Sequence, residues 1–307
     1  MWVGWCVSGP VVELQAESPP PLRYAPADRH PLDEAACRAK LASSAAQHEE
    51  NYRCLIDFAR LEQDYPLTPD DLKRITRDNI KAADQEQLDQ IYARLTAGAV
   101  PDGPFAIELF SPRDFGLLAE MAQLIARERM DPLKGLALLL SMPERERGVF
   151  VRLVWQGKVF LKNRRIVLTR IGDVSKLAAL IPPQPGQAPA TKPLPADRKP
   201  GLLFPAKVYC GQSLLDGRRE SIIIDYTFSH DISKEYRKDF VWMMGPNGLG
   251  IRDELRMIRP GFYLGRAYLG RIFAVNFILY SDALVGQDGS TTEDCEIGSQ
   301  RAAAAAR

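Results

Sequence analysis

The first half of the chain repeats its apolar residues at the spacing of an α-helix. Thr68 and Pro69 suit the cap and the first position of a helix, and Gly98 suits a left-handed C-terminal cap. The stripe between them recurs at helical spacing: Leu88, Ile91, Tyr92 and Leu95. This pattern predicts the clearest helix of the chain.

Segments on both sides of this stripe extend the helical pattern. Residues 32–63 are rich in Ala, Glu, Arg and Leu and contain neither Gly nor Pro. Further helix starts are indicated near residues 111–112 and 131–132. With residues 100–111 as a connecting loop, we expect a helical bundle over residues 32–154.

From Trp155 onward the apolar residues follow the spacing of β-strands. Turn signals such as Asp216 and Gly217 separate successive runs, and short connections require antiparallel neighbours. The predicted strands are 158–161, 166–170, 204–210, 220–226, 251–258, 262–269 and 272–280. Because closure removes exposed strand edges, we expect this meander to form a small barrel over residues 155–281. The expected fold class is α+β, a helical bundle followed by an antiparallel β-meander.

Three segments carry patterns that are typical of chain without regular structure. Prolines recur through residues 1–31, which we expect to be an extended leader, and through 182–200, a Pro-rich insertion in the barrel domain. Residues 282–307 are expected to form a disordered tail.

Charge and composition exclude two classes of partner. The chain has 40 Lys and Arg residues against 39 Asp and Glu residues, so its net field does not attract nucleic acid or anionic membranes. No apolar run reaches the roughly 20 residues that span a bilayer, so we expect a soluble protein without an integral membrane segment. The compartment stays open between the cytoplasm and, if an unrecognised leader is removed, the periplasm or the exterior.

The cysteines and histidines indicate neither a metal site nor a cofactor. The five cysteines show no CxxC or Cys/His spacing that would close a tetrahedral zinc site. Cys37 and Cys54 are placed either to bridge two helices in an oxidising compartment or to remain free thiols. Both alternatives stay open.

The densest group of polar residues lies in the segment 251–270. In a strand, Arg252, Glu254 and Arg256 share one face, while Asp253 and Leu255 share the other. If the charged face is internal, it would orient a carboxylate or phosphate head. The alternative is a lattice of ion pairs on the outer face. The predicted ligand-binding residues are Trp155, Arg252, Glu254, Arg256, Tyr263 and Tyr268.

Two further groups are open to a functional or a structural interpretation. Asp225 and Tyr226 end an apolar strand, where they and Glu254 are candidates for general acid or base catalysis; the alternative is that Asp225 caps a turn. The basic cluster of Lys158, Lys162, Arg164 and Arg165 fits either a phosphate-binding loop or a solvated turn.

Three segments carry a resemblance to a family of uncharacterised bacterial proteins: WQGKVF at 155–160, LLFPAKVYCGQSLLDGRRESIIIDY at 202–226 and RDELRMIRPGFYLGRAYLG at 252–270, together with DGPF around 102–105. That family implies no activity and no catalytic residues. Trp155 and Gly157, followed by the meander, also look like lipocalin-type and fatty-acid-binding barrels. This second resemblance implies a lipocalin-like barrel in which a tryptophan closes one end.

These observations lead to three hypotheses of function. The first is a protein that binds a small apolar or amphipathic molecule inside the barrel. The second is an isomerase or cyclase that uses the same interior as its active site. The third is a non-catalytic accessory protein with a solid barrel. The sequence does not identify a ligand or a protein partner.

Overall fold

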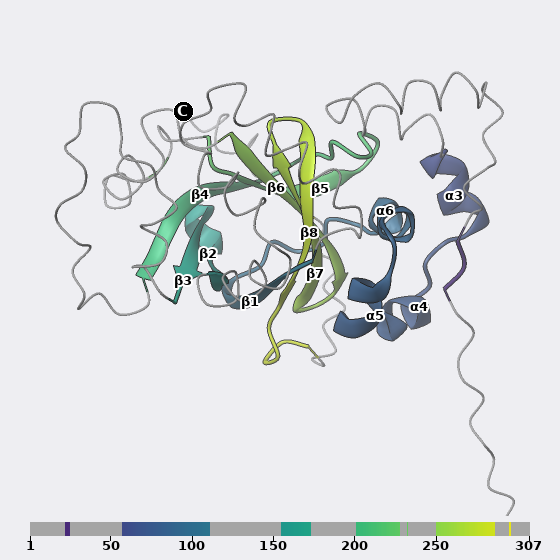
Figure 1. The fold of residues 1–307 in the computed structure, drawn as a ribbon, viewed down its shortest axis with the longest axis horizontal. Coiled ribbons are helices and arrows are strands. Elements are labelled where there is room, and N and C mark those ends of the chain that lie inside the picture. Colours follow the sequence, from purple (N-terminus) through teal and green to yellow (C-terminus); the bar gives the residue numbers. More distant parts are fainter. Residues whose placement is uncertain are drawn as a thin grey trace, which may run out of the picture.

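The computed structural model describes residues 22–24, 57–110, 155–172, 201–227, 232, 250–285 and 295. Eight antiparallel strands form a closed barrel in which each strand pairs with the next one along the chain, and β1 pairs with β8 (Figure 1). The strands are β1 (Gly103–Phe110), β2 (Trp155–Leu161), β3 (Ile166–Ile171), β4 (Gly201–Gln212), β5 (Glu220–Asp225), β6 (Ile251–Arg259), β7 (Phe262–Leu269) and β8 (Ile272–Tyr280). The predicted meander and its closure are confirmed.

Strand β1 corrects the prediction for residues 100–111. That segment was expected to be a loop, yet Gly103–Phe110 pairs with both β2 and β8 and closes the barrel. Its alternate residues Phe105, Ile107 and Leu109 all pack on the barrel interior. The barrel therefore takes one strand from within the range that was predicted to be helical.

Four short helices precede β1: α3 (Phe58–Asp64), α4 (Pro69–Arg74), α5 (Arg77–Ala82) and α6 (Gln85–Arg94). The predicted start at Thr68 and Pro69 is confirmed, and Thr68 forms a capping box with Asp71. Gly98 has a φ of 68° but does not cap a helix, because α6 ends at Arg94.

The helical bundle is not supported by the described residues. The helices pack against the outer wall of the barrel, beside β6, β7 and β8, rather than around a core of their own (Figure 1). The helices expected after residue 111 lie outside the described residues.

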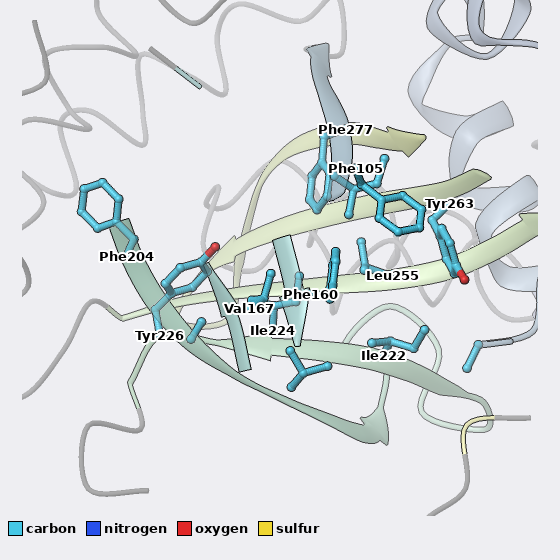
Figure 2. Packing of buried hydrophobic residues seen from close by; sticks show 14 of the residues in the cluster. Phe105, Phe160, Val167, Phe204, Ile222, Ile224, Tyr226, Leu255, Tyr263 and Phe277 are labelled. Atoms are coloured by element: carbon cyan, nitrogen blue, oxygen red, sulfur yellow. The ribbon is translucent and has the colours of Figure 1, made fainter. Parts of the chain in front are cut away.

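Buried apolar side chains form two groups, on the two sides of the barrel wall. The interior cluster lies inside the barrel and includes Phe105, Phe160, Leu255, Tyr263 and Phe277 (Figure 2). The wall cluster joins the helices to the outside of the barrel. Its main members are Leu61, Ile75, Ile80, Leu88, Ile91, Tyr92, Ile258, Phe262, Leu264 and Ile278.

The two ends of the barrel differ in how the strands are connected. Short connections join β2 to β3, β4 to β5 and β6 to β7, and they meet at one end, which we call the turn end. The segment 96–102 passes the turn end on its way to β1. Thr96 forms a bridge with Met257, and the Ala99 carbonyl accepts a hydrogen bond from the Tyr263 hydroxyl at 2.8 Å. Because Ala97 also joins the interior cluster, this segment covers the turn end.

A disulfide bond adds a second cover at the turn end. Cys210, on β4, is bonded to Cys295, and Cys295 is buried in the interior cluster. The prediction of a disordered tail over 282–307 is therefore wrong at Cys295. Cys37, Cys54 and the Pro-rich insertion at 182–200 lie outside the described residues, as does the leader apart from Leu22–Tyr24.

The helices that the structure describes are short. In the described part of the chain, no helix combines the length and apolar character that a bilayer span requires.

Candidate functional site

Strand alternation turns two charged residues into the barrel. On β2, Lys158 lies on the same face as Phe160, and on β6, Asp253 lies on the same face as Leu255. Both side chains are almost fully buried, with exposed fractions of 5% for Lys158 and 8% for Asp253. Such burial is unusual for charged groups unless they are paired.

These two residues form one polar group with Tyr226, which follows β5. The Lys158 ammonium lies 3.1 Å from Oδ2 of Asp253 and donates a hydrogen bond to the Tyr226 hydroxyl. The Tyr226 hydroxyl in turn donates to Oδ2 of Asp253 at 3.5 Å. We call Lys158, Tyr226 and Asp253 the interior triad.

Burial changes the titration of all three groups. It raises the pKa of Asp253 and of Tyr226 above their ordinary values, because the charged form of each loses its hydration. Burial alone would lower the pKa of Lys158, but its hydrogen bonds to Tyr226 and Asp253 and the charge of Asp253 outweigh burial, so that this pKa is raised. Lys158 is therefore protonated at neutral pH.

The interior triad lies away from the turn end. Strand β5 ends at Asp225, directly before Tyr226, and β6 begins at Ile251, directly before Arg252 and Asp253. The end of β5 and the start of β6 lie at the end of the barrel opposite the turn end. Figure 2 shows Phe204 and Tyr226 at one end of the interior cluster and Phe105 and Tyr263 at the other.

Phe204 carries a strained backbone near the triad. Its φ is 50°, although it precedes Pro205, a position that strongly favours extended backbone. A left-handed conformation at a bulky residue costs about 1–3 kcal/mol, and such strain gathers at functional sites. A register shift between Val167 and Thr169 lies opposite this part of β4.

The charged face of β6 points outward. The ligand-binding prediction required Arg252, Glu254 and Arg256 to line the interior, and it is wrong on this point. The alternative, an exposed lattice of ion pairs, is not what the structure shows either. Helix α6 and the connection from β4 to β5 cover this face, so that Glu254 and Arg256 are fully buried.

The covered face is a dense polar contact between the wall and the helix. Arg256 donates to the Tyr92 carbonyl at 2.8 Å and to the Ser221 hydroxyl at 3.0 Å. Glu254 accepts from the backbone N–H of Leu214 at 2.9 Å and pairs with Arg252 at 3.0 Å. The bond from Arg256 to Tyr92 attaches α6 to the barrel, and the bond from Leu214 to Glu254 attaches the connection between β4 and β5.

The remaining predicted site residues divide between the two sides of the wall. Tyr263 packs inside at the turn end, and Trp155 packs on the interior cluster while partly buried. Tyr268 lies outside, where its hydroxyl accepts from Arg266 at 3.0 Å. Of the catalytic candidates, Tyr226 is inside. Asp225 is outside and accepts from Tyr209 at 2.9 Å and from the Thr227 backbone at 2.8 Å.

Sequence reasoning missed two members of the triad. Lys158 was grouped with Lys162, Arg164 and the other basic residues at the hairpin tip, but it is buried while those residues lie in or beside the turn. The signal was the alternation in WQGKVF, which places Lys158 on the face of Phe160. The same rule places Asp253 with Leu255.

The described residues contain no group of three His, Cys, Asp or Glu side chains that is arranged to hold a metal ion. Comparisons of the chain with protein-family models, with curated proteins and with solved structures find no match. The resemblance to an uncharacterised bacterial family therefore stays a prediction.

Proposed function

We propose that this protein binds a small, largely apolar molecule in the barrel and holds the polar group of that molecule against the interior triad. The observation that carries the proposal is the buried pair of Lys158 and Asp253 inside a barrel whose interior cluster is largely apolar. Buried charges are costly for stability, and apolar residues of the same volume often serve stability as well or better. A functional role explains why they are there.

The dimensions of the barrel agree with this proposal. An interior of eight strands is wide enough to be filled by side chains or to hold one small ligand. Aromatic rings fill the half near the turn end, where Phe105 makes edge contacts with Phe160 at 5.7 Å and with Tyr263 at 5.8 Å. We place the ligand at the opposite end, beside Tyr226, because the interior triad offers polar contacts there.

The triad keeps hydrogen-bonding capacity for a ligand. A lysine ammonium has three N–H donors, and among the described residues two of those of Lys158 have acceptors, Tyr226 and Asp253. Both described contacts of Asp253 involve Oδ2, which leaves Oδ1 as an acceptor. A hydroxyl or carbonyl group would use this capacity.

Native mass spectrometry of gently purified protein tests the proposal. We expect a bound small molecule in the wild type and its loss in Lys158→Met. The matched control is Lys162→Met, since Lys162 is exposed in the turn at the far end of β2. A wild type without any bound molecule, and without binding of an amphipathic fluorescent probe, would instead support a solid barrel with an accessory role.

A second candidate is proton transfer in the same interior, as in an isomerase or cyclase. The observation that favours it is the contact of Tyr226 with both Lys158 and Asp253, three buried titratable groups with shifted pKa values. Asp225 and Glu254 have no place in such a reaction because they lie outside the barrel. Tyr226→Phe separates the two functions: a binding protein keeps its ligand, whereas an enzyme loses turnover of the molecule identified.

A further inference from the structure

Charge balance characterises the interior of the barrel. The ammonium of Lys158 and the carboxylate of Asp253 are in direct contact at 3.1 Å and neutralise each other. The other buried charged residues of the described chain bond to helices, to loops or to groups outside the wall, as Arg256, Arg266 and Glu254 do. Within the described strands, the interior thus holds one positive and one negative group.

The balance determines which polar group a ligand can bring. A carboxylate or phosphate would add a charge that nothing inside the described barrel neutralises, and it would face Asp253 across the triad. Burying an unbalanced charge is strongly unfavourable. A hydroxyl or carbonyl group adds no charge, accepts from the remaining N–H of Lys158, and, if it is a hydroxyl, donates to Asp253.

We infer that the ligand is an uncharged molecule with an apolar body and a single hydroxyl or carbonyl group, and that the barrel selects against the corresponding acid. This inference rests on the proposed function, because it names the chemistry of that same site. It replaces the expectation of a carboxylate or phosphate head, which depended on Arg252 and Arg256 pointing inward. Both arginines lie on the outer wall.

A matched pair of probes tests the inference. Titration calorimetry at neutral pH compares 1-octanol with octanoate, which share an apolar chain and differ in the charge of the head. The wild type should bind the alcohol at least about tenfold more tightly than the acid. A tenfold difference in affinity corresponds to about 1.4 kcal/mol of binding free energy. Equal or tighter binding of octanoate would overturn the inference and leave the proposed function standing.

A charge substitution sharpens the test. Asp253→Asn keeps the shape of the side chain but leaves Lys158 unbalanced, so we expect the preference to shift toward octanoate. The control is Asp225→Asn, the same change on the outer wall, where Tyr209 and Thr227 bind the side chain. That variant should keep the wild-type preference.

The outcomes distinguish failure of the inference from failure of the proposed function. If neither probe binds the wild type, both fail together. If the alcohol is preferred but Asp253→Asn folds and shows the same preference, the charge-balance explanation is wrong. If Asp253→Asn does not fold, the comparison of octanol with octanoate on the wild type still decides whether the barrel prefers an uncharged ligand.

Discussion

At Gly265 the missing side chain determines how the interior packs. Gly265 lies on the inner face of β7, and the ring of Phe277 from β8 lies directly against it, where a Cβ atom would overlap with three ring atoms. Phe277 belongs to the interior cluster of the barrel. The glycine therefore makes room for a ring and does not provide a turn.

We predict that Gly265→Ala lowers the free energy of unfolding by about 1–3 kcal/mol, because an added methyl group forces buried rings to move. Urea denaturation of the two proteins measures the change. Gly217→Ala is the control, since Gly217 is exposed and a Cβ there would meet no atom closer than 3.9 Å. Equal stability of wild type and Gly265→Ala would show that Phe277 packs elsewhere.

At the scale of elements, the cap of α4 couples its stability to pH. Burial alone would raise the pKa of Asp71, but hydrogen bonds from Thr68 and the charge of Arg74 outweigh it and hold this pKa below its ordinary value. Helix α4 also binds the barrel, because Arg259 donates to the Leu72 carbonyl at 3.0 Å. Loss of the cap should therefore loosen a contact with β6.

Asp71→Ala removes the carboxylate that accepts from the Thr68 backbone in the capping box, and it should cost about 1 kcal/mol at neutral pH. Because the pKa of Asp71 is lower in the folded than in the unfolded protein, its stabilisation is complete above about pH 4 and disappears as pH falls through the folded value. The difference in the free energy of unfolding between wild type and Asp71→Ala, measured by urea denaturation, should thus become smaller in acid. Asp70→Ala, at an exposed neighbour, should show little difference at either pH.

Helix α6 is attached by an ion pair that lies inside the contact with the barrel. Arg266 on β7 pairs with Asp89 on α6, and their side chains are 1% and 5% exposed. The Arg266 guanidinium also lies over the Phe273 ring at 4.3 Å. Removing one partner leaves the other buried and unbalanced.

We predict that Arg266→Met destabilises the protein by about 3–5 kcal/mol, and that the double variant Arg266→Met with Asp89→Leu recovers much of this loss. A double-mutant cycle by chemical denaturation measures the coupling between the two side chains. Additive losses would contradict the prediction. Asp70→Asn, in an exposed ion pair with Lys73, is the control and should leave stability nearly unchanged.

The sequence predicts elements better than it predicts which side of the wall a residue faces. Seven strands could be located because turns and alternation mark them, whereas β1 was taken for a loop because its turn signal at 101–104 runs directly into a short strand. Alternation on β6 correctly grouped Arg252, Glu254 and Arg256. It could not show that α6 would bury them, since that depends on contacts between residues far apart in sequence.

At the scale of the whole molecule, the disulfide ties the C-terminal segment to the barrel. Cys210 and Cys295 are separated by 85 residues, and such a bond restricts the unfolded chain over a long loop. Bonds of this kind persist in oxidising compartments. The sequence left the compartment open. The redox state of Cys210 and Cys295 in the cell is a measurable property that bears on this question.

Reduction should lower the free energy of unfolding of the wild type by about 2–4 kcal/mol. Thermal unfolding with and without a reductant measures this loss. The variant with both Cys210→Ala and Cys295→Ala should resemble the reduced wild type and should not respond further to the reductant. A wild type that is indifferent to reductant would show that this bond contributes no stability.

Closure of the barrel by β1 and β8 has a consequence for biosynthesis. They are the first and last strands of the sheet, and they pair residues as far apart in sequence as Ala106 and Tyr280. Until the ribosome has made β8, β1 lacks its partner on one side. The apolar side chains of the nascent meander then stay in contact with water. Synthesis of β8 must therefore come before the barrel closes, and until then the exposed apolar strands are open to chaperones and to aggregation.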